Sequence, residues 1–384
     1  RFNGEAPGYV YSRFANPTVA AFERKMAALE GGETAVGFAS GMAAISASLL
    51  GLLKAGDVVA CVGTLYGGTD GVMRSLLPRL GVTVRHFRTV DALRAGLDAG
   101  TRIVYVETPS NPTLEVMDLA QVAQIARQAG AISMADNTFS TPYLTRPLAL
   151  GMDVVVHSAT KFIGGHGTTL GGIIVDSGKF PWAEHKARFP RLNEPDVSYH
   201  GVVYTEALGP AAYIGRARVV PLRGMGAAIS PFNAFMILQG IETLALRMDR
   251  ICENTLKVAE FLKGHDKVAW VNYAGLSDHP DNGLVQKYMG GRASGIINFG
   301  VKSADGDGKA AGGRFQDALK LVTRLVNIGD SKSLACHPAS TTHRQLSPEE
   351  MKKAGVSEDM VRLSIGIEHI DDLLADLDQA LAAV

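Results

Sequence analysis

The chain has 384 residues, 46% of them hydrophobic, and it carries 38 basic and 38 acidic residues, so its formal net charge is zero. This length and apolar content suffice for a large core divided between two domains. The neutral balance without a basic block argues against nucleic-acid binding, and the short, interrupted apolar runs argue against a transmembrane helix. A small-molecule partner is therefore expected.

Short β-rich runs alternate with longer helical patterns in the first two-thirds of the chain. This alternation predicts an α/β fold whose mainly parallel sheet has helices on both faces and binds ligands beyond the carboxyl ends of its strands. The expected strands are Thr34–Ala39, Asp57–Gly63, Val82–Phe87, Arg102–Glu107, Ala131–Asp136, Asp153–His157 and Leu170–Val175. The expected helices are Ser40–Lys54, Gly68–Leu80, Val90–Ala99 and Leu119–Gln128.

The last third predicts a smaller α+β domain. A long helical stretch from Pro231 to about Lys263 begins at the N-cap Ser230, and the domain boundary is expected inside it. The glycine-rich segment Ala304–Gly313 is expected to be a loop. Further strands are expected near Val268–Tyr273, Ile296–Val301 and Arg362–Ile367, and helices at Arg314–Thr323 and Asp371–Ala383.

Lys161 and Asp136 follow or end two neighbouring apolar strands. Lys161 comes directly after Asp153–Thr160, and Asp136 closes Ala131–Asp136. Strands that end side by side would bring the amine and the carboxylate to one edge of the sheet. A pyridoxal phosphate enzyme requires this pair, because the lysine forms a Schiff base and the carboxylate keeps the pyridine nitrogen protonated.

An anion site is indicated where Ser40, Gly41 and Met42 open a helix after a strand. Free backbone N–H groups and the helix dipole favour a phosphate there, and the Ser158 and Thr160 hydroxyls could converge on it. The competing interpretation is an ordinary serine N-cap before an alanine-rich helix.

Two loops after strands carry further candidates. Tyr66 could stack on a planar cofactor and offer its phenol near the reacting carbon, or it could be a half-buried turn residue. Asn111 lies in the rigid loop Glu107–Pro112 and could contact cofactor or substrate, although a plain turn is the alternative.

Two arginines have separate interpretations. Arg13 could bind phosphate in a bidentate manner or be a solvated charge near the start of the chain. Arg362 stands within an apolar alternation, where a charge is costly unless it is paired. A substrate carboxylate or an internal acidic partner would satisfy it.

Metal and dinucleotide sites are not predicted. Cys336, His337 and His343 have a spacing that matches no common zinc motif. The glycine run Gly164–Gly167 follows Lys161 rather than opening a βαβ unit, so it is not a dinucleotide fingerprint. The three cysteines Cys61, Cys252 and Cys336 fit reduced thiols of a cytoplasmic protein.

Together these residues resemble the Cys/Met-metabolism family of pyridoxal-phosphate enzymes over nearly the whole chain. The shared elements are Tyr11–Arg13, Asn16–Thr18, Ser40–Met42, Glu107–Pro112, Asp136–Thr138 and Ser158–Lys161. The resemblance implies the type I, aspartate-aminotransferase-like fold with a seven-stranded sheet. It makes Lys161 the Schiff-base lysine, Asp136 the partner of the pyridine nitrogen and Tyr66 the stacking tyrosine.

The same resemblance implies further roles and an assembly. Gly41, Met42, Ser158 and Thr160 would bind the phosphate, and Arg362 would bind the substrate α-carboxylate. Tyr11 and Arg13 would reach the phosphate of a neighbouring subunit in a homotetramer built as a dimer of dimers. The expected parts are a remnant of an N-terminal arm at 1–13, a cofactor-binding domain at 14–240 and a C-terminal domain at 241–384, with upstream residues of the arm missing.

Three stretches resemble the O-acetylhomoserine sulfhydrylase branch of this family: Asn327–His343, Glu194–Gly201 and Tyr66–Gly68. Asn327 stands where other branches typically have serine, and with Asn111 it is expected to bind substrate. The implied reaction is γ-replacement, in which O-acetyl-L-homoserine and sulfide, or methanethiol, give homocysteine, or methionine, and acetate. The alternatives are a methionine γ-lyase, an O-succinylhomoserine sulfhydrylase or cystathionine γ-synthase-like activity, and a non-catalytic scaffold.

Overall fold

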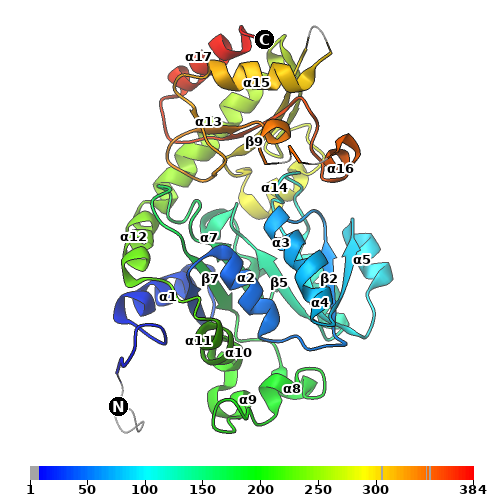
Figure 1. Ribbon diagram of the computed structural model, residues 1–384, viewed down its shortest axis with the longest axis vertical. Coiled ribbons are helices and arrows are strands. Elements are labelled where there is room, and N and C mark those ends of the chain that lie inside the picture. The colour runs from blue at the N-terminus through cyan, green and yellow to red at the C-terminus, as the bar shows by residue number, and fades with distance from the viewer. Residues whose placement is uncertain (1–7, 304–305, 343, 346) are drawn as a thin grey trace.

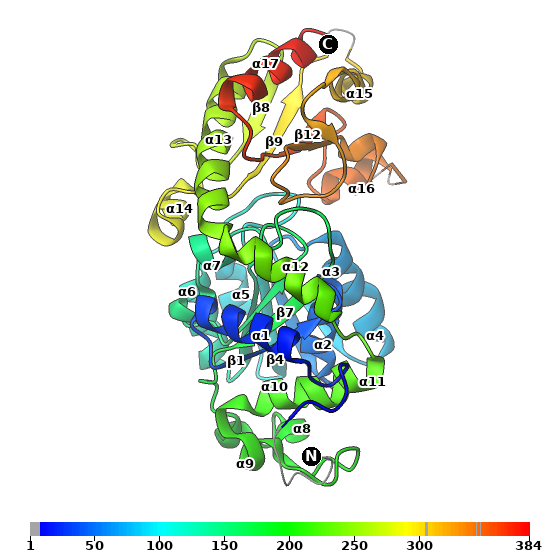
Figure 2. The same cartoon turned by 90° about the vertical axis from the view of Figure 1, so that its left-hand side faces the viewer.

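The computed structural model describes residues 8–303, 306–342, 344–345 and 347–384. The strands of these residues form two sheets, and each sheet lies in its own lobe (Figures 1 and 2). The large lobe holds the first sheet and the small lobe holds the second, which lies toward the C-terminus. The chain passes from one to the other through α12 (Pro231–Glu242) and α13 (Leu244–Gly264).

The large lobe has a seven-stranded sheet in the order β1-β7-β6-β5-β4-β2-β3. Strands β2 to β6 pair in parallel, and β7 runs antiparallel to both neighbours. The mainly parallel sheet predicted from the alternating pattern is confirmed. The strands are β1 (Thr34–Phe38), β2 (Val58–Val62), β3 (Thr83–Phe87), β4 (Thr101–Glu107), β5 (Ile132–Asp136), β6 (Val154–Ser158) and β7 (Gly172–Asp176).

Helices cover both faces of this sheet. On one face α2 packs with Val154 and Val156, and on the other α1 packs with Val155 and Ile173. The helices are α1 (Pro17–Glu30), α2 (Gly41–Leu50), α3 (Gly67–Gly71), α4 (Leu77–Arg79), α5 (Val90–Gly96), α6 (Leu119–Gln128), α7 (Thr141–Leu144), α8 (Pro190–Asn193), α9 (Tyr204–Leu208), α10 (Ala212–Ala217) and α11 (Arg223–Met225). The expected helix Gly68–Leu80 is α3 and α4 joined by the π-helical turn Val72–Leu76.

The small lobe has a five-stranded sheet in the order β10-β11-β12-β9-β8 with its own apolar core. The smaller α+β unit expected after the long helical stretch is therefore present. Its strands are β8 (Val268–Asn272), β9 (Ile296–Val301), β10 (Thr323–Arg324), β11 (Leu334–Cys336) and β12 (Met360–Ser364). Its further helices are α14 (Asn282–Met289), α15 (Gly308–Ala318), α16 (Pro348–Lys353) and α17 (Ile370–Leu381).

Two local predictions in this part of the chain are wrong. Helix α15 begins inside the segment expected to be a loop, because the Asp307 side chain caps the Ala310 N–H at 2.9 Å and Phe315 is buried against the core. The long helical stretch is divided at Thr243, whose backbone leaves helical geometry at φ −105° and ψ 6°. The domain boundary at residues 240–241 lies close to this break and stays a prediction.

Candidate active site

The carboxyl ends of β4, β5 and β6 bring the central candidates together. Glu107 at the end of β4 is the register partner of Asp136 at the end of β5, and Asp136 also pairs with Val156 of β6. Lys161 follows β6 after a tight turn in which its N–H donates to the Ser158 carbonyl at 3.2 Å. The acid and the amine therefore follow adjacent strands, in the arrangement that the sequence predicts.

Asp136 is held by the turn that follows it. Its Oδ1 accepts the Thr138 N–H at 2.9 Å, while the Thr138 hydroxyl oxygen accepts the Ser158 N–H at 2.9 Å. Burial raises the pKa of Asp136, and the hydrogen bonds from Thr138 oppose that rise. Nothing in the sequence pattern alone singles out Thr138, which links the carboxylate to the strand that leads to Lys161.

Lys161 is half-buried between the two lobes. Its Nζ donates to Oδ1 of Asn327, in the segment that precedes β11. Burial and the positive charge of Arg362 lower the pKa of Lys161 to about 8. A substantial fraction of this amine is therefore neutral near physiological pH, as a nucleophile and a general base require.

The backbone after Lys161 is fixed by a buried arginine that the sequence prediction missed. Arg247 of α13 donates through Nη1 to the Phe162 carbonyl at 2.7 Å and through Nη2 to the Ile163 carbonyl at 3.2 Å. Ser331 of the small lobe donates its N–H to the Gly165 carbonyl at 2.8 Å. The lysine turn is thus anchored by residues far away in sequence.

The amino terminus of α2 lies against the end of β6. A Cβ on Gly41 would lie 2.6 Å from the Ser158 Cβ, so only glycine allows this approach. The Ser40 hydroxyl oxygen caps the Ala43 N–H at 3.1 Å. The N–H groups of this helix terminus, including that of Met42, and the Ser158 hydroxyl are donors of the kind that favour an anion, and their contact with a phosphate stays a prediction.

Thr160 is engaged differently from the prediction. Its hydroxyl donates to the Gly171 carbonyl at 3.2 Å, and its oxygen accepts the Gly171 N–H at 3.1 Å. These two contacts fix the turn to the segment before β7. A contact between Thr160 and a phosphate stays a prediction.

Tyr66 is positioned by Glu107. The Tyr66 N–H donates to Oε2 of Glu107 at 2.7 Å, and the Tyr66 side chain is 45% exposed. Burial and the nearby Asp136 raise the pKa of Glu107 well above its usual range. From the sequence, Glu107 is expected only to begin a loop. Its position at the end of an apolar strand, like that of Asp136, is nevertheless a signal that it belongs to the site.

Arg362 extends from β12 of the small lobe and is half-buried. Its Nη2 donates to the Val326 carbonyl at 2.6 Å and its Nη1 to Oδ1 of Asn111 at 3.4 Å. Burial lowers its pKa. Over the part of the chain that the structure describes, no carboxylate lies within ion-pair distance of Arg362. The geometry therefore favours an external carboxylate over an internal acidic partner.

The loop that carries Asn111 is held by the small lobe. The Asn298 side chain donates to the Pro112 carbonyl at 2.6 Å, and the Asn272 side chain donates to the Thr113 carbonyl at 2.8 Å. Asp281 accepts the Val116 N–H at 3.0 Å. This loop of the large lobe is therefore fixed at the boundary between the lobes, beside Arg362.

Tyr11 and Arg13 have their contacts elsewhere in the large lobe. Arg13 donates to the Arg223 carbonyl at the start of α11, and its guanidinium lies 4.8 Å from the centre of the Phe14 ring. Tyr11 is 56% exposed. Their hydrogen bonds and ring contacts among the described residues do not involve Lys161, Asp136 or Ser158, so the structure does not bring these two residues into the site of their own chain.

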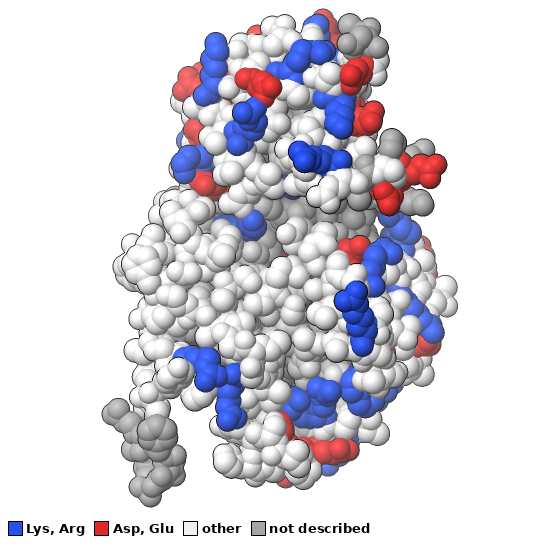
Figure 3. All heavy atoms as spheres, in the orientation of Figure 1, with Lys and Arg blue, Asp and Glu red and all other residues white. Residues whose placement is uncertain are grey.

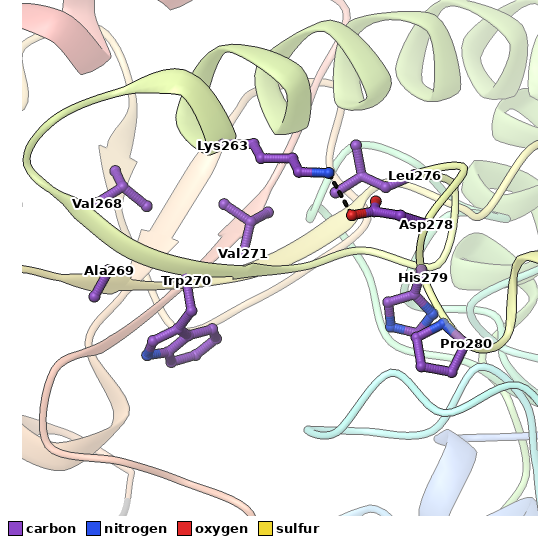
Figure 4. Close-up of a pocket in the computed structure, with 9 residues that line it drawn as sticks. All are labelled: Lys263, Val268, Ala269, Trp270, Val271, Leu276, Asp278, His279 and Pro280. Carbon is purple, nitrogen blue, oxygen red and sulfur yellow. Dashed lines mark hydrogen bonds and ion pairs between the residues drawn. The ribbon is translucent and has the colours of Figure 1, made fainter.

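A hollow lies on the small lobe (Figure 4). It has a volume of about 340 Å³ and lies beside β8, with Lys263, Trp270, Asp278 and His279 among its lining residues. Lys263 and Asp278 form an ion pair across it at 2.5 Å. None of the predicted site residues lines this hollow.

His337, a residue of the rejected zinc interpretation, has hydrogen-bond partners of its own. His337 contacts the Ser340 hydroxyl at 2.9 Å and the Glu358 carbonyl at 2.7 Å, and His343 lies outside the described residues. In the described ranges, no group of three or more His, Cys, Asp or Glu side chains is arranged to hold a metal ion. In the same ranges, no helix combines the length and hydrophobicity needed to cross a membrane.

An amine of lowered pKa, a partly buried carboxylate at the end of the adjacent strand and a helix terminus with free N–H groups fit pyridoxal phosphate. Lys161 fits its aldehyde and Asp136 fits its pyridine nitrogen, and the close approach of Gly41 brings the α2 terminus and the Ser158 hydroxyl together as donors for its phosphate. These residues define the class of site: that of a pyridoxal-phosphate enzyme.

Comparisons with known proteins identify the family. The sequence profile of the Cys/Met metabolism PLP-dependent enzymes matches residues 1–382. The chain is 46% identical to the homocysteine synthase of Schizosaccharomyces pombe, covering 99% of this chain and 88% of that protein. It is 48% identical to the O-acetyl-L-homoserine sulfhydrylase 1 of Thermus thermophilus, covering 98% of this chain and 89% of that protein. The chain therefore belongs to the Cys/Met metabolism family of pyridoxal-phosphate-dependent enzymes.

A solved structure agrees with this assignment. The crystal structure described as an O-acetylhomoserine (thiol)-lyase of Campylobacter jejuni superposes with a TM-score of 0.93 at 39% identity, covering all of this chain and 90% of that one. It contains N′-pyridoxyl-lysine-5′-monophosphate, in which the cofactor is joined to a lysine. The type I fold is confirmed, and pyridoxal phosphate is the cofactor of this enzyme.

Proposed function

We propose that the enzyme catalyses γ-replacement on O-acetyl-L-homoserine, in which sulfide displaces acetate and L-homocysteine forms. The observation that carries this proposal is the half-buried Lys161 amine, of lowered pKa, beside both Asn327 and Arg362. The names of the relatives support the same substrate, since they include homocysteine synthases and O-acetyl-L-homoserine sulfhydrylases. The reaction belongs to methionine biosynthesis.

Each site residue has its own role in this reaction. Bound pyridoxal phosphate supplies an electron sink that makes the Cα and Cβ protons of the substrate acidic. Lys161 takes and returns these protons, and Asp136 holds the proton at the pyridine nitrogen. Gly41, Met42, Ser158 and Thr160 would bind the phosphate, and Tyr66 would stack on the ring and assist the departure of acetate.

The residues that bind the substrate come mainly from the small lobe. Arg362 binds the α-carboxylate with its planar fork, and Asn111 orients that fork. Asn327 supports the Lys161 amine and contacts the substrate. The division into a cofactor-binding domain up to about residue 240 and a substrate-gripping C-terminal domain is part of this proposal.

The proposed assembly is a homotetramer, a dimer of dimers in which each active site uses Tyr11 and Arg13 of a neighbouring subunit. The exposure of Tyr11 and of apolar side chains on α12 and α13, such as Phe232 and Leu246, supports it. Figure 3 shows few charged side chains over the left-hand side of the large lobe, near α12. A cytoplasmic location is proposed because the buried Cys61, Cys252 and Cys336 are unpaired thiols.

The test is a comparison of products from matched substrates. Purified enzyme is given sulfide with O-acetyl-L-homoserine or with O-succinyl-L-homoserine, and homocysteine and the released acid are measured. The proposal expects homocysteine and acetate in equal amounts and much slower turnover of the succinyl ester. Faster turnover of the succinyl ester, or release of methanethiol from methionine as the main activity, would replace the proposal with one of its alternatives.

A further inference from the structure

A buried guanidinium lies against the turn that follows Lys161. Arg247 is 4% exposed, and its side chain donates to the Phe162 carbonyl at 2.7 Å and to the Ile163 carbonyl at 3.2 Å. The same side chain donates to the Gly240 carbonyl of α12 at 2.6 Å. One arginine therefore binds the two carbonyls that come directly after the reactive lysine and a third from the helix that leads out of the large lobe.

Arg247 also lies where the chain passes from the large lobe to the small lobe. It is in the first turn of α13, four residues after Thr243, which separates α12 from α13. The Arg247 N–H donates to the Thr243 carbonyl at 3.0 Å, and its Nε donates to the Thr243 hydroxyl oxygen at 3.1 Å. The side chain thus connects the junction between the two helices with the backbone of the lysine turn.

The glycine run Gly164–Gly167 makes room for these contacts. A Cβ on Gly165, whose φ is +73°, would lie 2.2 Å from Nη1 of Arg247. A Cβ on Gly240 would lie 2.1 Å from the carbonyl oxygen of Gly164. Glycine at these positions lets the guanidinium and the backbone of α12 come close to the lysine turn. The run, which is not a dinucleotide fingerprint, therefore has an explanation in the packing around Arg247.

The small lobe holds the same turn through a different segment. Ser331 donates its N–H to the Gly165 carbonyl at 2.8 Å and its hydroxyl to the same oxygen at 2.7 Å. A Cβ on Gly329 would lie 2.5 Å from the Phe162 nitrogen, so this segment also packs closely on the turn. The backbone after Lys161 is therefore held by two parts of the chain that are far away in sequence.

Arg247 is a costly residue to bury at this place. Among the described residues, no carboxylate lies within ion-pair distance of its guanidinium, and burial of an unpaired charge is unfavourable. Burial lowers the pKa of Arg247 to about 10, and the negative charge of Asp330 opposes that fall. Four hydrogen bonds to oxygen atoms offset the cost. An apolar side chain could fill the volume, but it could not fix the direction of the two carbonyls after Lys161.

We propose that Arg247 is a positioning residue of the active site, which binds the two carbonyls after Lys161 and so fixes the backbone from which the amine reaches the substrate. The inference rests on the proposed role of Lys161 in taking and returning the substrate protons. Proton transfer requires the amine to be within hydrogen-bond reach of its target. A misplacement of about 1 Å can lower a rate by about 10². Through Thr243, the position of the amine also depends on the junction between the lobes.

The test uses Arg247→Met and Arg247→Lys. Methionine is a flexible apolar side chain without a donor, whereas lysine keeps the charge but lacks the planar fork that binds several carbonyls at once. The measurements are kcat, KM for the amino-acid substrate, the melting temperature and the rate at which cofactor-free protein captures pyridoxal phosphate. The exchange of the Cα proton with deuterated water is followed on L-norvaline, an amino acid without a leaving group.

A misplaced amine affects proton transfer more than substrate binding. Arg247→Met should therefore lower kcat and the exchange rate by about 10², with KM almost unchanged. Capture of pyridoxal phosphate should also become slower, because the same amine attacks the aldehyde. Arg247→Lys should recover part of each loss, since it can still bind one carbonyl. If the methionine variant does not fold, the lysine variant decides by the same comparison with the unaltered enzyme.

Arg216→Met is the matched control. Arg216 is 6% exposed, donates to the Gly51 carbonyl at 2.9 Å and pairs with Asp196 at 2.7 Å. None of its hydrogen bonds among the described residues reaches the turn after Lys161. Its loss should lower the melting temperature and leave kcat, exchange and capture unchanged.

The comparison of the two methionine variants separates positioning from stability. If Arg247→Met lowered kcat and the exchange rate no more than Arg216→Met does, Arg247 would be structural only and the inference would be overturned. A rise in KM with an unchanged exchange rate would overturn it as well. Failure of the unaltered enzyme to exchange the Cα proton would instead refute the role of Lys161 and the proposed function.

Discussion

Lys161 and Asn327 meet across the boundary between the two lobes, where the lysine amine donates to the side-chain carbonyl oxygen of the asparagine. The two residues belong to different lobes and are 166 positions apart in sequence. The contact places the reactive amine under the control of the small lobe. Any change in how the lobes dock therefore acts on the reactivity of Lys161.

Replacement of Lys161 by alanine should abolish turnover and the visible absorbance of bound cofactor. Both the covalent anchor and the group that moves the substrate protons are lost. Activity and spectra are measured on the purified variant. Lys186→Ala, at an exposed position, is the control and should behave as the unaltered enzyme. Near-normal turnover of the Lys161 variant would remove this residue from the mechanism.

Asp136→Asn should fold and yet have a kcat lower by about 10² or more, the effect typical of lost electrostatic preorganisation. An asparagine cannot hold the pyridine nitrogen in its protonated form. Steady-state kinetics and the melting temperature are measured together. Asp91→Asn, on the exposed surface of α5, serves as the control. Unchanged kinetics in Asp136→Asn would show that this carboxylate does not serve the cofactor.

Arg362→Lys should raise KM for the amino-acid substrate with little effect on cofactor affinity. A planar guanidinium grips a carboxylate through two hydrogen bonds, whereas an ammonium offers a point charge, and the difference for one charged hydrogen bond is about tenfold. KM, cofactor affinity and melting temperature are compared. A large loss of thermal stability with an unchanged KM would mean that Arg362 has a structural partner instead.

The capture of pyridoxal phosphate by cofactor-free enzyme should speed up as pH rises toward about 8 and then level off. Burial and Arg362 lower the pKa of Lys161 to about 8, and only the neutral amine attacks an aldehyde. Below this pKa the rate should fall about tenfold per pH unit, because the neutral fraction falls by that factor. Stopped-flow absorbance measures the rate. A midpoint near that of an ordinary lysine would contradict the lowered pKa.

Mixtures of inactive Lys161→Ala and inactive Arg13→Ala subunits should regain activity after subunit exchange. If each site uses Arg13 of its neighbour, a mixed dimer has one site with both defects and one site with neither. Arg13 is expected to support cofactor binding through a charge-assisted contact with phosphate. The control mixes Lys161→Ala with itself and should stay inactive. No recovery after confirmed exchange would mean that each site is contained in one subunit.

The strand ends of the large lobe could be predicted because their signals are local. Lys161 and Asp136 each follow or end a short apolar run, and sheet topology then puts both at one edge. A binding role for Arg362 could be predicted for a similar reason, since a charge within an apolar strand needs a partner. The rise and fall of hydrophobicity over a few residues carries all of this information.

The features that the sequence did not predict depend on contacts between residues that are far apart in the chain. Helix α15 forms in a glycine-rich segment because burial of Ala311 and Phe315 outweighs a poor helix propensity. The His157–Glu30 pair joins residues 127 positions apart, and neither residue has a local pattern that announces the other. Arg247 is similar, because its acceptors are backbone carbonyls that leave no trace in the sequence. Contacts of this kind require the folded chain.

The loop around Asn111 has a consequence for how new specificities could arise. Asn298 and Asn272 of the small lobe hold the backbone of this loop, and neither is among the residues predicted to touch substrate. Substitutions at these two positions would move the backbone beside Asn111, whose side chain accepts a hydrogen bond from Arg362 at 3.4 Å. For a laboratory that wants to change the accepted acyl group, these asparagines are places to diversify outside the predicted catalytic residues.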